Sequence, residues 1–335
     1  MKFKTFIGID VSKLTLDICI VRENVSIDYY KISNQSRALD KFFEKFVPAN
    51  MKEAVLVCAE HTGHYSNLLK SCCLTQGINL WLESGAEIKL SSGVQRNKSD
   101  KIDASRIAKY AARYSDKARL ETLEPESLRE AKLLLSERDL YVRERAKYKA
   151  QSKDLKDFIS TTHFKTRKHR MNRHIKLLTH SIEQIDQKLK KIFMTSQELL
   201  RQREILKSID GVGEQVAVNT IVATRGFRKY KNGRQFACHA VVAPFSYSSG
   251  TSQRSRKKVS HRANKKLKAL FHMAALSAIK MKGEFRDYFE RKLEEGKNKM
   301  TIINAIRAKI INRMFALIRE DRKYQKNYKP HLINP

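Results

Sequence analysis

The sequence has no run of 18 or more apolar residues, so a membrane-spanning helix is not expected. We also expect no export signal, because no apolar stretch with a small-residue cleavage site opens the chain. The five cysteines are odd in number, lack CxxC spacing and lie in apolar stretches. This usage disfavours a disulfide framework or a structural zinc site and favours reduced thiols in a cytoplasmic protein.

Acidic residues are scarce beside basic ones, since 35 Asp and Glu face 68 Lys and Arg and the formal net charge is +33. So large an excess would repel itself in an isolated globule, which favours a polyanionic partner such as nucleic acid. An anionic membrane surface is a weaker alternative, because the richest basic stretch is a loop and not an amphipathic helix. The length of 335 residues and a hydrophobic content of 41% predict two or three domains with buried cores.

Residues 1–123 alternate between strand-like and helix-like patterns. Strands are predicted over residues 3–9, 15–21, 26–32, 54–59 and 78–82, and helices over residues 36–46, 64–75 and 100–114. Three strands followed by alternating helices and strands are typical of a mixed sheet covered by helices. We therefore predict an α/β domain over residues 1–123.

Residues 124–207 predict two long antiparallel helices. No Gly or Pro occurs from residue 126 to 162, a basic turn is predicted at residues 163–170, and apolar residues recur at 3-4 spacing afterwards. The recurring residues are Ile175, Leu178, Ile182, Ile185, Leu189, Ile192 and Leu199. Such a pair would form a coiled-coil arm of about 50–55 Å, or else an ordinary hairpin within a bundle. Residues 208–335 predict a third, mostly helical domain.

Four acidic residues are candidate metal ligands. Asp10 and Glu60 each end a predicted strand, whereas Asp100 and Asp103 fall on one face of the first turn of a helix that Ser99 can cap. Hard divalent cations prefer carboxylate oxygens, so the four acids could hold two Mg²⁺ ions suited to phosphodiester chemistry. Without metal, the crowding of these acids should raise the pKa of at least one of them.

Each acid also has a simpler explanation. Asp10 could cap a turn, Glu60 could be a solvated strand end, and the two helical aspartates could only interact with the helix dipole. Their combination in one α/β domain of a strongly basic protein is what favours a metal site.

Two loops in the third domain are candidate phosphate-binding elements. The turn containing Gly211 and Gly213 is typical of a helix–hairpin–helix, in which backbone N–H groups meet a phosphate, and fits a packing corner equally well. Ser248 and Ser249 precede Gly250, and eight Lys and Arg but no acid occur from residue 249 to residue 268. On the residues alone, simple phosphate binding by these serines is favoured over nucleophilic attack, because no His or Asp lies beside them in sequence.

Basic residues around the serine loop are the predicted nucleic-acid contacts, together with the two glycines of the turn. The basic residues are Arg254, Arg256, Lys257, Lys258, Arg262, Lys265 and Lys266. Two further basic stretches, at residues 163–170 and 225–236, contain Phe or Tyr, which could stack on unpaired bases. Phosphate neutralisation of this kind predicts an affinity that falls steeply with salt.

Five stretches, taken in order, resemble the IS110-family transposases, a group that includes the Piv-type DNA invertases. They read FIGIDVSKLTLDICIV, CAEHTGHY, RNKSDKIDASRIAKY, SIDGVGEQVA and SYSSGTSQRSRKKVSHRANKKLKALFHMAA, and the resemblance spans about residues 4–320. It implies a RuvC-like domain of the RNase H fold, a coiled-coil middle and a C-terminal transposase domain. It also implies that Asp10, Glu60, Asp100 and Asp103 are the DEDD metal ligands and that Ser249 is the nucleophile.

The implied activity is the cutting and rejoining of donor and target DNA through a covalent serine–DNA link, with Mg²⁺ assisting. The resemblance further implies a structured non-coding guide RNA, a homodimer or higher homo-oligomer, and a cytoplasmic, nucleoid-associated bacterial protein. Two positions depart from the family, since Ser248 doubles the candidate serine and Ala263 stands where Gly is common. Two alternatives remain, a metal-only nuclease of the RuvC type and a non-catalytic nucleic-acid-binding scaffold.

Overall fold

The computed structural model describes residues 3–22, 25–91, 93, 99–154, 156–240, 248–249, 253–254 and 264–326. The chain divides into two compact units, Met1–Leu123 and Glu124–Pro335. The predicted boundary between residues 123 and 124 coincides with this division, whereas the one between residues 207 and 208 lies within the second unit. None of the helices in the described part of the chain is long and apolar enough to cross a membrane.

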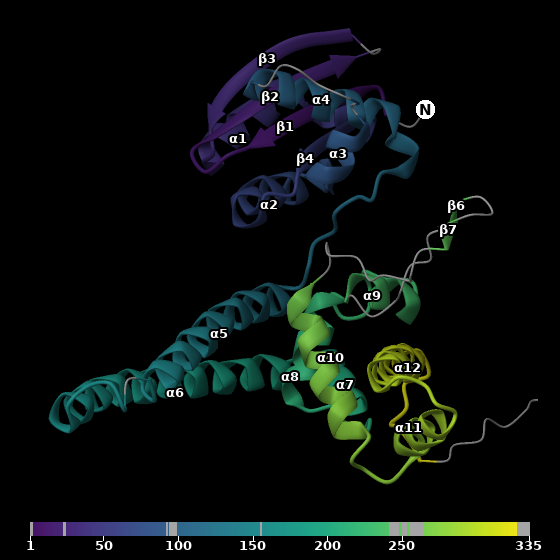
Figure 1. The fold of residues 1–335 in the computed structure, drawn as a ribbon. Helices are drawn as coiled ribbons and strands as arrows, with labels where there is room; N and C mark the ends of the chain where they lie inside the picture. The colour runs from purple at the N-terminus through teal and green to yellow at the C-terminus, as the bar shows by residue number, and fades with distance from the viewer. Residues whose placement is uncertain are drawn as a thin grey trace, which may run out of the picture. The chain divides into compact units, whose positions relative to one another are not determined.

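The first unit is built on a five-stranded mixed sheet (Figure 1). Its strands are β1 (Thr5–Val11), β2 (Thr15–Arg22), β3 (Val25–Ser33), β4 (Val55–Glu60) and β5 (Asn79–Glu83), in the spatial order β3-β2-β1-β4-β5. The first three strands pair antiparallel, whereas β1 pairs with β4 and β4 with β5 in parallel. The α/β prediction is confirmed, and every predicted strand is present with its ends shifted by no more than two residues.

Side chains alternate between the two faces of this sheet. Ile7 and Val57 belong to a core cluster with the helices α1 (Ser36–Phe46) and α2 (Asn67–Thr75). Phe6 and Cys58 point the other way, into a cluster with α3 (Gly85–Ser91) and α4 (Asp100–Arg113). Short 3-10 helices at Ala49–Ala54, Gly63–Ser66 and Ser115–Lys117 complete the unit. Helix α3 was not predicted.

Gly8 allows α4 to approach β1 closely. A Cβ atom at Gly8 would overlap backbone atoms of Ala104 and Ala108, so only glycine fits this point of the strand. The facing side of α4 is correspondingly made of small buried residues. Because Asp100 and Asp103 belong to the first turn of the same helix, this contact holds them at a fixed height above β1.

The second unit is helical. Helices α5 (Glu126–Gln151) and α6 (Thr161–Thr195) lie side by side as a hairpin (Figure 1). The remaining helices are α7 (Gln197–Lys207), α8 (Glu214–Ala223), α9 (Gly233–His239), α10 (Lys265–Ala278), α11 (Glu284–Glu294) and α12 (Lys299–Arg319). Two short strands, β6 (Ser248–Ser249) and β7 (Gln253–Arg254), pair antiparallel. The prediction of a mostly helical C-terminal part is confirmed.

The α5–α6 hairpin is antiparallel, as predicted. Arg138 bonds to Asp186 at 2.7 Å, and the ring of Tyr148 stacks on His174 with centroids 4.9 Å apart. Of the predicted seam, Ile182, Ile185, Leu189 and Leu199 are buried, whereas Ile175, Leu178 and Ile192 are half-buried.

The helices of the hairpin end at different residues than predicted. Helix α5 ends at Gln151, and α6 already begins at Thr161, so the basic stretch at residues 163–170 is helical and not a turn. The cause is Ser160, which caps α6 by accepting a hydrogen bond from the His163 N–H. A second cap, Ser196, accepts from the Leu199 N–H and separates α6 from α7, where one continuous helix was predicted.

All five cysteines are free in the structure. Cys19, Cys58 and Cys73 are buried in the first unit, and Cys72 and Cys238 are half-buried.

Candidate active site

Asp10 and Glu60 lie at the ends of neighbouring parallel strands. The register pairs Ile9 of β1 with Ala59 of β4, so the two acids are the next residues along each strand. Side chains two residues apart in a strand point to the same face of the sheet. Asp10 therefore shares the face of Phe6 and Gly8, and Glu60 shares the face of Cys58, which is the face that α4 covers. The topology thus brings together two acids that are 50 positions apart in sequence.

Asp100 and Asp103 occupy the first turn of α4, where the sequence placed them. The Ser99 side chain accepts a hydrogen bond from the Ile102 N–H at 3.3 Å, which confirms the predicted cap. The carboxylate of Asp103 binds the Arg106 guanidinium at 2.6 Å.

The pKa of Asp10 is raised from its ordinary 3.8 to about 6, first by burial and then by four negative charges. In decreasing order, these belong to Asp103, Asp100, Glu60 and Asp17. All four predicted acids therefore occupy one electrostatic neighbourhood, and the prediction that crowding raises a carboxyl pKa is confirmed. We call these five residues the acidic corner.

Asp17 is the member of the acidic corner that the sequence analysis missed. It stands directly opposite Asp10 in the β1–β2 register and is only 2% exposed. Its carboxylate accepts a hydrogen bond from the Tyr29 hydroxyl and lies 3.4 Å from the Lys31 ammonium, which is also 3.8 Å from Asp100. The sequence did contain a signal, because Asp17 is the one acid in an otherwise apolar strand. It lies two residues before Cys19, so both side chains belong to the same face of the sheet.

Gly85, the first residue of α3, packs against the Glu60 side chain. A Cβ atom at Gly85 would overlap the Glu60 carboxylate, so the missing side chain leaves room for this acid. Glu60 is consequently confined between the end of its own strand and the start of α3.

The donor set of the acidic corner fits a hard divalent cation. It consists only of carboxylate oxygens, which Mg²⁺ prefers, and burial followed by the neighbouring carboxylates raises the pKa of Asp10. No three His, Cys, Asp or Glu side chains in the described ranges lie close enough together to hold a metal ion. Asp103 and Asp100 instead face Arg106 and Lys31. The acids are therefore gathered at one place, but their side chains do not converge.

Most of the predicted serine loop lies outside the described residues. The backbone of Ser249 belongs to β6 and pairs with Gln253, but its side chain, like those of Ser248 and Arg254, is not described. Gly250, Arg256, Lys257, Lys258, Arg262 and Ala263 also lie outside the described residues. The roles predicted for these residues remain predictions.

The glycine turn packs against a helix of its own unit. Gly211 has a left-handed backbone with φ of +82°, and a Cβ atom there would overlap the Ala274 carbonyl oxygen of α10. This contact is the packing corner that the sequence left as an alternative. Gly213 is the N-cap residue of α8 and has open space around it. Phosphate binding by either glycine stays a prediction.

The two lysines at the start of α10 differ in their surroundings. Lys266 binds the Asp139 carboxylate of α5 at 2.5 Å, whereas Lys265 is exposed. Asn264 caps this helix by accepting hydrogen bonds from the N–H groups of Lys266 and Leu267, each at 3.1 Å.

The aromatic residues of the basic stretch at residues 225–236 pack against the helical core. Phe236 is fully buried, Phe227 packs on Phe315 with centroids 4.9 Å apart, and Tyr230 packs on Phe236 at 5.3 Å. Phe236 is therefore unavailable for the stacking expected of it, whereas stacking by the half-buried Phe227 and Tyr230 stays a prediction. The arginines between them serve partly as internal ion pairs, such as Arg228 with Glu198 at 2.8 Å.

Comparison with known proteins defines the class. A family model of DEDD transposases of the IS110 type, described as "Transposase", matches residues 7–160, which include all four predicted acids. A second model, described as "Transposase IS116/IS110/IS902 family", matches residues 203–290, which include the glycine turn and the serine loop. The chain is therefore a transposase or site-specific recombinase. It belongs to the IS110 family of transposases.

Similar proteins support this assignment. The chain is 26% identical over 329 residues to the pilin gene-inverting protein of Moraxella bovis, covering 96% of this chain and 98% of that protein. The pilin gene-inverting protein of Moraxella lacunata is 25% identical with the same coverage. A 44.8 kDa protein of insertion element IS116 from Streptomyces clavuligerus is 25% identical over 150 residues, which are 44% of this chain and 37% of that protein.

Among solved structures, the chain matches Thermus thermophilus RuvC, both alone and in complex with a Holliday junction substrate. The match to the complex covers 36% of this chain and 99% of RuvC at 12% identity, with a TM-score of 0.28. The match to RuvC alone covers 35% of this chain at 12% identity, with a TM-score of 0.27.

Proposed function

We propose that this transposase cuts and rejoins DNA with a divalent cation, Mg²⁺, bound at the acidic corner and with Ser249 as the nucleophile. The observation that carries the cation site is the pKa of Asp10, which burial and four neighbouring carboxylates raise to about 6. Asp10, Glu60, Asp100 and Asp103 would hold the cation. When bound, it would neutralise charge on the phosphate and on the attacking and leaving oxygens.

The chain's own residues prepare this site. Gly8 and Gly85 set where α4 and Glu60 lie, and Lys31 and Arg106 balance part of the negative charge while no cation is bound. Asp103 must exchange Arg106 for the cation, because its carboxylate cannot serve both at full strength. With the cation bound, the acidic corner would bind a DNA phosphate that the carboxylates alone would repel.

In the proposed covalent step, the Ser249 Oγ forms a bond to the DNA phosphorus. The bond from phosphorus to one sugar oxygen breaks, and the released sugar hydroxyl takes up a proton while the serine hydroxyl loses one. Attack of a sugar hydroxyl from another DNA end reverses these changes and rejoins the strand. The basic residues from 254 to 266 would hold the phosphate backbones, in keeping with the +33 charge of the chain.

The first experiment removes the serine hydroxyl. Full-length Ser249→Ala protein is incubated with DNA carrying the ends of the element and with Mg²⁺, and protein–DNA adducts are counted on a denaturing gel. We expect no adduct and no recombinant product, whereas Ser248→Ala keeps both. Continued cutting by Ser249→Ala would instead support the metal-only nuclease.

The second experiment removes acids from the acidic corner. Asp10→Ala combined with Asp103→Ala should abolish strand exchange, whereas Asp116→Ala, which removes an exposed acid of the same unit, should leave it intact. A non-catalytic scaffold would keep its biological effect with both acids gone.

The proposed guide RNA and homo-oligomer need separate tests. Nucleic acid that copurifies with the full chain should include a discrete non-coding RNA from the flank of the element when it is sequenced. Random cellular RNA would argue against guidance. Light scattering of the purified complex should give at least two copies of the chain.

A further inference from the structure

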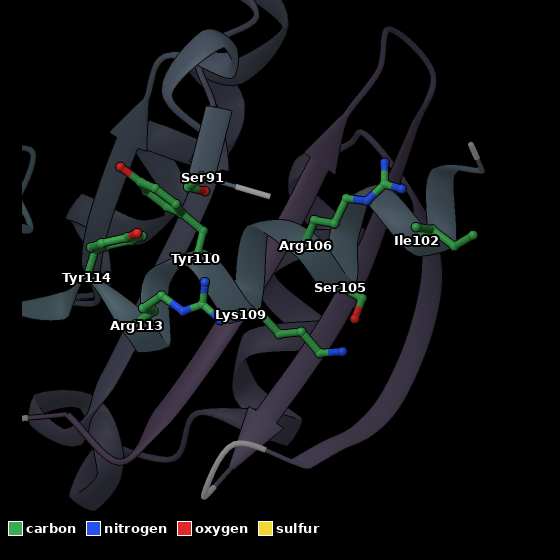
Figure 2. A pocket seen from close by; sticks show the side chains of 8 residues that line it. All are labelled: Ser91, Ile102, Ser105, Arg106, Lys109, Tyr110, Arg113 and Tyr114. Atoms are coloured by element: carbon green, nitrogen blue, oxygen red, sulfur yellow. The ribbon is translucent and has the colours of Figure 1, made fainter. Parts of the chain in front are cut away.

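A cavity of about 430 Å³ runs along the outer side of α4 in the first unit. Figure 2 shows that its lining side chains come mainly from α4 itself, with Tyr114 at the end of this helix and Ser91 at the end of α3. We call it the α4 pocket. Its volume lies in the range of pockets that bind one small ligand.

Three cationic side chains line the α4 pocket. Arg106, Lys109 and Arg113 recur at 3-4 spacing, so they share one side of α4, opposite the small residues that face the sheet. Lys109 and Arg113 are exposed, and neither forms an ion pair within the described part of the chain. From Arg106 to Arg113 the helix rises by about 10 Å, so the three side chains follow one line along the helix.

Two aromatic rings close the far end of the α4 pocket. Figure 2 shows the side chains of Tyr110 and Tyr114. The centroids of these two rings lie 5.0 Å apart, and the Tyr110 ring lies 5.2 Å from that of the buried Trp81. Both tyrosines are half-buried, and the Lys117 ammonium lies over the Tyr114 ring, 5.1 Å from its centroid. Aromatic rings beside cationic groups are the combination that binds unpaired nucleotides.

The α4 pocket borders the acidic corner. Arg106 lines the pocket and also binds the Asp103 carboxylate at 2.6 Å. A strand with its reacting phosphate at the acidic corner would therefore have its neighbouring phosphates within reach of Lys109 and Arg113.

We propose that the α4 pocket binds unpaired nucleotides of the DNA strand that is cut, directly beside the reacting phosphate. Lys109 and Arg113 neutralise successive phosphates, and a base stacks on Tyr114. This inference rests on the proposed function, because the acidic corner is what makes the cut strand the favoured occupant over any other nucleic acid.

The first test measures the affinity of the full-length protein for single-stranded DNA by fluorescence anisotropy, in EDTA so that no strand is cut. Lys109→Ala with Arg113→Ala should weaken binding at least tenfold and lower the slope of log affinity against log salt by about 1.4, at 0.7 per phosphate. The matched control is Arg37→Ala with Lys41→Ala, an exposed Arg and Lys four residues apart on α1, across the sheet. It should change the affinity less than threefold. Equal losses in the two double variants would overturn the proposal.

The second test separates the ring from the hydroxyl at Tyr114. Tyr114→Leu should weaken the binding of single-stranded DNA roughly tenfold through lost stacking, whereas Tyr114→Phe should keep it. Ultraviolet crosslinking of a bromouracil-containing strand, followed by mass spectrometry, should label the peptide containing Tyr110 or Tyr114. Crosslinks confined to other peptides would contradict the proposal.

The occupant is tested with a matched RNA strand. A Lys109→Ala, Arg113→Ala protein that loses affinity for RNA but keeps affinity for DNA would overturn the assignment to the cut DNA strand. These binding assays need no catalysis, so they can fail while the acid and serine variants still confirm the proposed function, and the reverse also holds.

Discussion

The two units of this transposase differ in their overall charge and in the sign of the charges that they bury or crowd together. Residues 1–123 contain 19 Lys and Arg against 14 Asp and Glu, whereas residues 124–335 contain 49 against 21. The nearly balanced first unit nevertheless gathers five carboxylates at the acidic corner. The strongly basic second unit buries Arg307, which is 4% exposed and contacts His272 at 2.5 Å, without an ion pair to any described acid.

This difference teaches that net charge does not identify a site, whereas local crowding does. In the first unit, the fold holds like charges together on strand ends and a helix turn, which favours a cation as the missing partner. In the second unit, burial lowers the pKa of Arg307, and burial followed by the charges of Arg307 and Lys268 lowers the pKa of His272. Crowding in the second unit therefore disfavours the charged forms of its basic groups, whereas crowding in the first disfavours the charged form of an acid.

The largest effect is expected from Gly8→Val. The added side chain would overlap the backbone of α4, so we expect the first unit to lose about 3 kcal/mol or more and strand exchange to disappear. Thermal unfolding and circular dichroism would show this loss. The control is Gly213→Ala in the second unit, where the space is open and the cost should stay below about 1 kcal/mol. Similar costs at both glycines would contradict the close helix–strand contact.

The next largest effect is a gain in the free energy of unfolding on Asp10→Asn substitution when no metal is present. Because the fold raises the pKa of Asp10 to about 6, the free energy of unfolding falls as pH rises from about 4 to about 6 and stays lowered above that range. A shift of this size corresponds to roughly 3 kcal/mol, which solvent screening at a half-buried site reduces to about 1 kcal/mol. Asp10→Asn should therefore be more stable than the unmodified protein at pH 7.5 and equally stable at pH 4, as measured by denaturant unfolding in EDTA.

Added Mg²⁺ sharpens the same comparison. It should stabilise the unmodified protein at pH 7.5 through binding to the folded state and have little effect on Asp10→Asn. If Mg²⁺ stabilised both proteins equally, the acidic corner would not be the cation site.

A smaller effect is expected from Arg307→Met in the second unit. The buried guanidinium has an Nε that no described group accepts from, so a methionine of similar length should match or raise stability by up to about 1 kcal/mol. Unlike Asp10→Asn, this variant should respond to Mg²⁺ as the unmodified protein does. A stability loss of several kcal/mol would show that Arg307 has a counter-charge in the folded chain.

Gly85→Ala should have the smallest effect on stability. Replacing a glycine at the start of α3 should raise the free energy of unfolding, because alanine has less conformational freedom in the unfolded chain. Moving the Glu60 carboxylate should lower it by nearly as much, so we expect a net change within about 0.5 kcal/mol. The displaced carboxylate should still weaken Mg²⁺ binding several-fold in a calorimetric titration. Unchanged Mg²⁺ affinity would show that Glu60 is not a ligand.

The sequence predicted the first unit well because strand and helix periods are local signals. Asp10, Glu60 and Asp103 could be chosen for the same reason, since each stands at a recognisable strand end or helix start. Asp17 was missed because its role depends on cross-strand register, which a single strand does not reveal. The caps Ser160 and Ser196 were missed because a serine inside a Gly-free and Pro-free stretch does not by itself end a helix.

The central claim is tested most directly by crystals of the full chain soaked in Mn²⁺, whose anomalous scattering locates the ion. We predict a peak coordinated by carboxylate oxygens of Asp10, Glu60, Asp100 and Asp103, with Arg106 released from Asp103. Peaks only elsewhere on the protein, with Asp103 still bound to Arg106, would contradict it.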